Sequence, residues 1–259
     1  MREFKGAQNF VRKNFYVYLV VRKFAPLLCR FLDLEDGFSF LSSIQPTTGA
    51  IAIDVGSNDG TSVALISRHV SPVDVACFDP VRAPISSTPS KTQISFFPFG
   101  LGDVTDNLRI FTPVVRGFRL TQYSSAQKDR LNHQLFHDLG LNLQDISLEE
   151  RLVQVRRLDE LNLRPFFIKI DVEGNELKVL RGSQETIRMH QPVILVEIQN
   201  ESIYEEISDF MTALRYANFA PSPPKIDNWN NIVLQTRFNS RYNNYLWLPI
   251  ESSPNWTYK

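Results

Sequence analysis

The chain has 259 residues, 43% of them hydrophobic, and its 28 basic and 28 acidic side chains leave no net charge. This composition supports a sizeable buried core and excludes a disordered chain. A zero net charge also argues against nucleic acid as a main partner, because phosphate binding usually requires a basic excess.

The first 32 residues differ from the rest, with seven basic side chains, one acidic side chain and many aromatic and aliphatic ones. Arg22 and Lys23 interrupt the apolar run well before the ~20 residues that a spanning helix needs. No uninterrupted apolar run leads to a signal-peptide cleavage site. We predict a helical extension over residues 1–45. Its helix either packs on the domain with its basic residues in water, or binds a membrane surface or a partner.

From residue 46 to 259 we predict one domain in which strands and helices alternate, after a linker at 42–49. Strands are expected at 50–55, 73–79, 93–102, 107–113, 165–172, 192–198, 232–238 and 244–249, and helices at 61–70, 175–190 and 202–219. Continuous apolar strands between helices indicate an α/β fold with a mostly parallel sheet covered on both faces. The last two strands predict an antiparallel hairpin at one edge. Residues 114–150 are polar and are predicted to form an inserted lid or substrate segment.

The two cysteines also limit the choice of environment. Cys77 lies in a predicted buried strand, so neither a disulfide framework nor a cysteine metal site involving Cys29 is expected. We therefore predict a reducing compartment, the cytoplasm, with peripheral membrane contact through residues 1–32 as an extension of that prediction.

The stretch "IDVGSNDG" at 53–60 ends a predicted strand and opens a helix. Ligands of doubly wound sheets bind at such carboxyl ends, where glycines allow close backbone approach. Asn58 replaces the second glycine of the dinucleotide fingerprint, and Asp54 and Asp59 add negative charge beside the turn. This pattern disfavours a pyrophosphate and favours a cationic ligand such as S-adenosylmethionine; the alternative is a tight turn without a ligand. The predicted cofactor-binding residues here are Asp54, Gly56, Ser57, Asn58 and Gly60.

Two more acids follow the next predicted strands. Asp79, about 20 residues beyond the glycine turn, is placed to accept hydrogen bonds from ribose hydroxyls. Asp103, in "FGLGD", is placed to meet the adenine amino group, with Gly102 before it. Each acid alone is typical of a turn, but acids at three successive strand ends together predict a cofactor site.

The motifs "IDVGSNDG", "FDP", "GLGD", "LDEL", "IKIDVEGNELKVLRG" and "PVILVEIQ" follow one another as in the FkbM family of S-adenosylmethionine-dependent methyltransferases, which the chain resembles over roughly residues 50–250. The ending "NNYLWLP" resembles that family's terminal strand. The resemblance implies a Rossmann-like, seven-stranded methyltransferase sheet and methylation of a hydroxyl oxygen, often on a sugar or a polyketide-type product. Asp79 stands where the family usually has Glu, and residues 114–150 and the first 45 match nothing in the pattern.

In a sheet of this kind, the end of the strand at 165–172 lies beside the reactive methyl group. A hydroxyl is a weak nucleophile, so a base that takes its proton assists transfer. Asp171 and Glu173 are the predicted catalytic residues, because two positions on an extended segment share a face; the alternative for Asp171 is a loop cap. Glu176 is expected to start the next helix, and Lys169 to pair with one of the acids.

Two other arrangements remain open at this site. Glu197 with Asp171 and Glu173 would offer oxygen ligands for Mg²⁺, but a metal is not expected. His133 and His137 share a face at helical spacing without a third metal ligand. They are interpreted as lid residues, and they are the second choice for the base.

These features predict an O-methyltransferase acting on a sugar, a glycan or another small molecule, with S-adenosylmethionine as its cofactor. The alternatives are a non-catalytic binding or scaffold protein, which the retained acids oppose, and a nicotinamide-dependent oxidoreductase, which Asn58 and Asp59 oppose. The sequence names neither the acceptor nor an oligomeric state.

Overall fold

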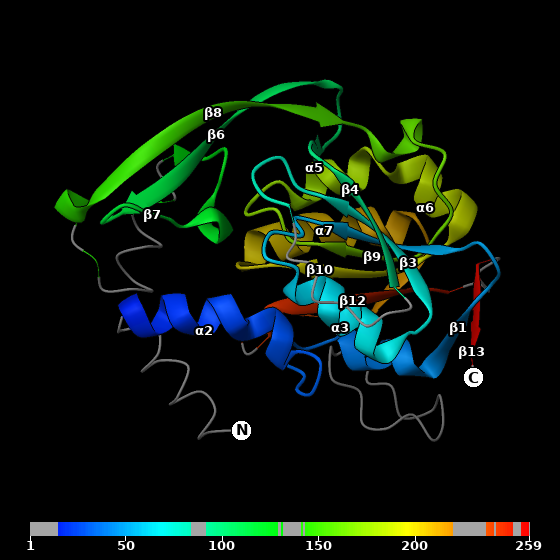
Figure 1. Ribbon diagram of the computed structural model, residues 1–259. Helices are drawn as coiled ribbons and strands as arrows, with labels where there is room; N and C mark the ends of the chain where they lie inside the picture. Colours follow the sequence, from blue (N-terminus) through cyan, green and yellow to red (C-terminus); the bar gives the residue numbers. More distant parts are fainter. Residues whose placement is uncertain are drawn as a thin grey trace.

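The computed structural model describes residues 15–83, 92–128, 131, 141, 143–219, 237–240, 242–250 and 255–258. Its main sheet is formed by β2 (Ile51–Val55), β3 (Val73–Phe78), β4 (Thr92–Phe97), β9 (Pro165–Ile170), β10 (Val193–Glu197), β11 (Tyr216–Phe219) and β12 (Asn244–Pro249). These seven strands lie in the order β11-β12-β10-β9-β2-β3-β4; β3, β4, β9, β10 and β12 are labelled in Figure 1. Neighbours from β4 to β10 are parallel, and β12 is antiparallel to both β10 and β11. The predicted α/β fold with a mostly parallel sheet is confirmed.

Helices cover both faces of this sheet, which is why its strands are apolar on both sides. The helices are α2 (Phe15–Leu28), α3 (Thr61–His69), α5 (Glu176–Arg181), α6 (Gln184–His190) and α7 (Glu201–Ala213), with the 3-10 turn η1 at Phe38–Ser43. One core cluster joins α5, α6 and α7 to the face that carries Ile53 and Ile168. A second joins α3 and η1 to the face that carries Ala52 and Phe167. In Figure 1, α6 and α3 accordingly lie on opposite sides of the sheet.

A second sheet stands beside the first. It consists of β5 (Gly100–Leu101), β6 (Asp106–Val115), β7 (Phe118–Arg119) and β8 (Ile146–Arg156), in the order β5-β8-β6-β7. The antiparallel β6–β8 ribbon forms the arch in Figure 1. A third core cluster packs Phe15 and Tyr18 of α2 against Leu120 and Tyr123 near the end of this ribbon. The N-terminal helix therefore packs on the inserted region as well as on α3.

Several secondary-structure elements differ from those predicted from the sequence. Strand β8 was not expected, because Ile146–Leu152 is largely exposed on both faces and lacks an apolar alternation. The predicted helix at 202–219 ends at Ala213; Arg215 has a left-handed φ of 64°, which breaks a helix, and β11 follows. The antiparallel partners of β12 are β10 and β11, whereas residues 232–236 of the predicted hairpin lie outside the described residues.

Two further boundaries differ from the prediction. The helix expected at 175–190 is divided into α5 and α6 at Gly182 and Ser183. Gly182 packs against the backbone of Gly102, and a Cβ at Gly182 would lie 1.8 Å from the Gly102 oxygen. The expected linker at 42–49 contains strand β1 (Ile44–Pro46), which pairs with β13 (Trp256–Tyr258) in a separate two-stranded sheet. Asn255 donates from Nδ2 to the Pro165 oxygen at 3.0 Å, which fixes this small sheet on the large one.

Both cysteines are buried free thiols, and Cys77 lies in the buried strand predicted for it. Burial raises the pKa of Cys29 to about 12 and that of Cys77 further, so neither thiol is a reactive thiolate near neutral pH. Within the described ranges, no helix is long and apolar enough to cross a membrane.

Candidate active site

The turn after β2 is held against the end of β9. Gly56 has a φ of 85°, and a Cβ on it would lie 1.8 Å from the backbone oxygen of Asp171. The N–H of Gly56 donates to the Phe78 oxygen at 2.8 Å, and the N–H of Asp171 donates to the Val55 oxygen at 2.9 Å. Three strand ends therefore converge on this turn with almost no space between backbones, and a glycine is required at position 56.

Asp54 lies behind the turn and is completely buried. Its Oδ2 accepts a hydrogen bond from the Ser62 hydroxyl at 2.7 Å, while no donor among the described residues reaches its Oδ1. Burial, opposed by the Ser62 hydrogen bond, raises the pKa of Asp54 to about 7. The Ser57 hydroxyl is also buried, with the weakly hydrogen-bonding Cys77 thiol beside it and no oxygen or nitrogen partner in the described part of the chain. Two polar atoms next to the glycine turn thus have unused hydrogen-bonding capacity, as expected of a site that holds a polar ligand.

The raised pKa of Asp54 predicts how stability depends on pH. The folded protein holds this proton more tightly than the unfolded chain, so its contribution to stability falls as the pH rises from about 4 to about 7. A shift of roughly 3 pKa units corresponds to about 4 kcal/mol. We expect Asp54→Asn to remove that contribution. The free energy of unfolding of the variant minus that of wild type should therefore increase between pH 4 and pH 7. Urea titrations at several pH values measure it.

The exposed acid Asp74, at the opposite end of β3, provides the matched control. Asp74→Asn removes the same charge from an exposed position and should not reproduce the pH-dependent gain expected of Asp54→Asn. Parallel curves for wild type and Asp54→Asn would show that Asp54 titrates normally in the folded protein.

Asp79 connects the glycine turn to the end of β3. Its Oδ2 accepts from the Asn58 N–H at 2.9 Å, and its Oδ1 accepts from the N–H groups of Val81 and Arg82 at 2.7 and 2.8 Å. Burial raises its pKa, although these backbone hydrogen bonds and Arg82 lower it in part. The acid predicted to contact a ribose therefore also fixes the turn. Its contact with a ligand stays a prediction.

Asp59 pairs with the N-terminal helix, which the sequence did not predict. Its Oδ1 accepts from the Thr61 N–H and hydroxyl at 3.1 and 2.7 Å, and its Oδ2 lies 2.8 Å from a guanidinium nitrogen of Arg22. Burial raises the pKa of Glu35, which is also close enough to interact with Arg22 and Asp171. Residues of the N-terminal extension thus belong to the site. In the sequence, Arg22 is only a basic residue within an apolar helix, and this pattern does not predict an ion pair with Asp59.

The end of β9 collects several charged groups. Lys169 is buried in the strand and donates to Asn244 Oδ1 at 2.6 Å. Burial lowers its pKa, but Asp171 and Glu197 outweigh burial and raise it overall. Glu197 is hydrogen-bonded to Asp171, and burial together with the charge of Asp171 raises the pKa of Glu197 well above its ordinary value. The charges of Asp171 and Glu197 thus act on Lys169 while its hydrogen bond goes to Asn244, so its expected pairing with one of the acids stays a prediction.

The loop after β9 contradicts the prediction that Asp171 and Glu173 share a face of an extended strand. Extended structure ends at Ile170, and Glu173 has a left-handed φ of 53°, so strand alternation does not determine how Asp171 and Glu173 point. The Glu173 carboxylate accepts from Gln199 Nε2 at 2.9 Å. Glu176 begins α5 as expected, and its carboxylate accepts from the Gly174 N–H at 2.8 Å.

The inserted segment borders both parts of the site. The Thr121 hydroxyl donates to Asn58 Oδ1 at 2.8 Å, and the Ser125 hydroxyl donates to the backbone oxygen of Glu173 at 3.0 Å. The first part of the insertion thus connects the glycine turn to the loop that carries the predicted catalytic residues. Neither contact had a sequence signal. His133 and His137 lie outside the described residues.

Gly102 and Asp103 lie between the second sheet and the α5–α6 junction. The Gly102 N–H donates to the Arg156 oxygen at 3.0 Å, and Gly182 packs on both Gly102 and Asp103. These contacts are structural, and the proposed adenine contact of Asp103 stays a prediction. Among the described residues, no three His, Cys, Asp or Glu side chains are arranged to hold a metal ion.

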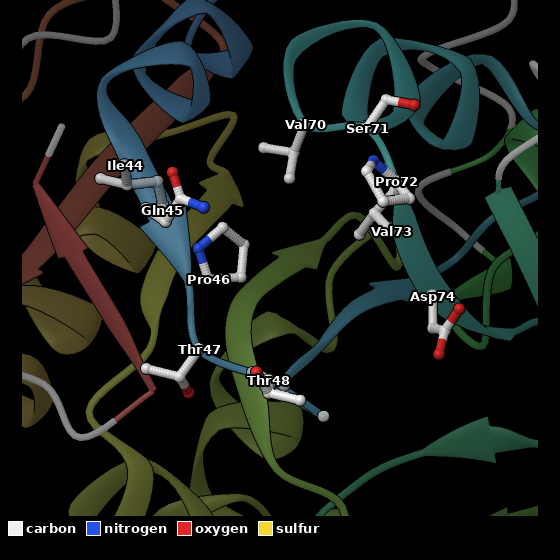
Figure 2. Close-up of a pocket in the computed structure, with 12 residues that line it drawn as sticks. Ile44, Gln45, Pro46, Thr47, Thr48, Val70, Ser71, Pro72, Val73 and Asp74 are labelled. Carbon is white, nitrogen blue, oxygen red and sulfur yellow. The ribbon is translucent and has the colours of Figure 1, made fainter.

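A separate hollow of about 370 Å³ lies at the other end of the sheet (Figure 2). It is lined by residues 44–50 and 70–74, next to the starts of β2 and β3. Parallel sheets bind ligands outside the carboxyl ends of their strands. No predicted site residue lines this hollow, and we assign no ligand to it.

Comparison with known proteins gives one family. The model of the family described as "Methyltransferase FkbM domain" matches residues 54–221. A methyltransferase FkbM from Methylobacillus flagellatus KT, known from a crystal structure, is 16% identical with a TM-score of 0.45; the match covers 83% of this chain and 48% of that one. The chain thus spans about half the length of that protein. No curated protein matches the chain.

Proposed function

The chain belongs to the FkbM methyltransferase family, and from this premise we propose that it transfers a methyl group from S-adenosylmethionine to a hydroxyl of a sugar, a glycan or another small molecule. The observation that carries the proposal is the convergence of the glycine turn, Asp79 and Asp171 at neighbouring strand ends. The family match supports methyl transfer; the cofactor, the oxygen acceptor and the substrate class are proposed. A cytoplasmic location is proposed on the two buried free thiols.

The residues present fit this cofactor. The buried Asp54 Oδ1 and the Ser57 hydroxyl have unused hydrogen-bonding capacity beside a turn that passes close to another backbone. S-adenosylmethionine carries a positive charge and no phosphate, which suits a turn flanked by carboxylates. When bound, it would supply an electrophilic methyl group. Asp54, Gly56, Ser57, Asn58 and Gly60 would hold its amino-acid end, and Asp79, Gly102 and Asp103 its nucleoside.

The protein's contribution to catalysis is positioning and proton transfer. An acceptor oxygen must lie in line with the transferred methyl group at about 3 Å. Thr121 and Ser125 connect the insertion to both sides of the site, so this segment forms the wall against which an acceptor would be oriented. Asp171 or Glu173 would accept the hydroxyl proton as the oxygen attacks.

The first test is cofactor binding. We expect calorimetry to show saturable binding of S-adenosylmethionine and none of NADH. Asp79→Ala should weaken the affinity by about 1.5–3 kcal/mol, the range for a hydrogen bond to a charged group. Asp79→Glu should lose far less, because a carboxylate remains for both the turn and the ligand.

The control is Asp74→Ala, at the other end of the same strand, which should bind as wild type does. NADH binding in place of S-adenosylmethionine would contradict the cofactor assignment. Binding without methyl transfer to any member of a hydroxyl-bearing sugar panel, followed with labelled S-adenosylmethionine, would favour a scaffold role or another acceptor class. Equal losses in Asp79→Ala and Asp79→Glu would remove Asp79 from the ligand site.

A further inference from the structure

The outward face of α2 and of the turn after it is apolar. Its side chains recur at helical spacing along 16–32, and Val20, Phe24 and Phe31 are 57%, 49% and 74% exposed. The other exposed apolar side chains of this surface are Tyr16, Val21, Leu27, Leu28 and Leu32. Contiguous exposed apolar surface of this kind usually marks an interaction site.

The opposite face of α2 fixes its orientation. Phe15 and Tyr18 are buried in the cluster shared with the inserted region, and the Tyr18 hydroxyl accepts from Gln122 Nε2 at 2.6 Å. Arg22 pairs with Asp59 at 2.8 Å. These contacts hold the apolar side chains outward, because rotating the helix to bury them would break the ion pair and expose Phe15.

Within the stretch that forms this surface the charges have one sign, and the acids Asp33, Glu35 and Asp36 follow it. The stretch from Phe15 to Leu32 contains no acidic residue. Lys23 is exposed between Val20 and Phe24. At the beginning of the helix, Arg116 lies over the Tyr16 ring with its guanidinium carbon 5.9 Å from the centroid, and Phe118, 47% exposed, packs edge-on against Phe15. An apolar helix face bordered by basic side chains is the pattern of helices that lie in the surface of anionic membranes.

We propose that this surface, made of the outward face of residues 16–32 and the β6–β7 turn at 116–118, docks on an anionic lipid bilayer. The helix would lie in the interfacial plane, because its 14 residues span about 21 Å, less than the hydrocarbon core. A second copy of the chain is a poorer occupant, since a two-fold axis through this face would bring Lys23 of each copy toward like charges. The proposal does not depend on the methyl acceptor.

The experiment is sedimentation of the full chain with vesicles. We expect it to bind vesicles with about 30% phosphatidylserine at least roughly tenfold more strongly than vesicles of phosphatidylcholine alone, and this preference should fall with added salt. The variant Val20→Ser/Phe24→Ser/Phe31→Ser should lose at least tenfold in binding. Lys23→Gln/Arg116→Gln should keep weak binding but lose the preference for anionic vesicles.

The matched control is Leu152→Ser/Met189→Ser/Ile250→Ser, which removes three apolar side chains of similar exposure (65%, 68% and 65%) from other elements and should bind as wild type does. Unchanged melting temperatures and S-adenosylmethionine affinities would show that each variant is folded. Equal binding of wild type to both vesicle types, or wild-type binding by the α2 variant, would overturn the proposal. A solution dimer that the α2 variant alone dissociates, without vesicle binding by wild type, would assign the surface to a second copy.

Discussion

Asp171→Asn should lower kcat by about 10²–10⁴-fold and leave the affinity for S-adenosylmethionine close to that of wild type. This range is the usual contribution of a positioned general base. The amide keeps the size of the side chain, and the backbone hydrogen bond from the Asp171 N–H to the Val55 oxygen does not depend on it. Turnover would be measured on the acceptor identified with labelled S-adenosylmethionine, and affinity by calorimetry.

The surroundings of Asp171 favour it over Glu173 for this role. Glu197 is hydrogen-bonded to Asp171, and Lys169 lies close enough for its pKa to be raised by that carboxylate. The hydrogen bond with Glu197 orients the Asp171 carboxylate at the strand end. Glu173 is already engaged by the Gln199 amide. We therefore expect Glu173→Gln to have the smaller effect on kcat.

One control variant and two contradicting outcomes make this result decisive. Glu205→Gln, an exposed acid on α7, should leave kcat unchanged. Near-normal turnover in both Asp171→Asn and Glu173→Gln would place the base elsewhere, and His133 and His137 would be examined next. Loss of wild-type activity in a chelator, restored by Mg²⁺, would instead assign the acids to a metal that acidifies the hydroxyl.

Gly56→Ala should abolish measurable cofactor binding and lower the free energy of unfolding by at least about 3 kcal/mol, within the range of severe point mutations. The new Cβ would lie 1.8 Å from the Asp171 backbone oxygen, so either the turn or the end of β9 must move. Because that contact is to backbone, no side-chain rotation relieves it. Chemical denaturation and calorimetry measure the two effects.

Gly117→Ala separates this clash from the general cost of a left-handed residue. Gly117 has nearly the same φ, 81° against 85°, but a Cβ on it would meet nothing within 4 Å. It should lose only the roughly 1–2 kcal/mol of an unfavourable φ and should keep cofactor binding. Similar losses in the two variants would show that the close approach of the turn to β9 has no special importance.

The sequence predicted the fold best where burial is strongest. All six residues of β9 are buried, and this continuous apolar run identified a central parallel strand. The start of α5 followed from Glu176 at the positive end of a helix. The turn at 56–60 was identified from its glycines and acids, because close approach and a left-handed backbone restrict the residue type.

The missed elements had no such local signal. Strand β8 is held by its long hydrogen-bonded ladder with β6, and most of its first seven side chains are exposed. Strand β11 exists because β12 offers it an edge, a tertiary effect that no local pattern records. Arg22 and Glu35 enter the site through the packing of α2 on the inserted region and α3. Those positions depend on contacts between segments distant in sequence.

The pairing of β1 with β13 sets an order for assembly during synthesis. Ile44–Pro46 leaves the ribosome about 200 residues before Trp256–Tyr258, its only strand partner in the described part of the chain. At roughly 5–20 residues per second, the first strand waits about 10–40 s with its edge unpaired. Trp256 then closes the amino end of the sheet, with its indole N–H donating to the Gln191 oxygen at 3.0 Å. Strand β13 therefore completes a strand made about 200 residues earlier, and a nascent chain that stalls just short of β13 would present an open strand edge to chaperones.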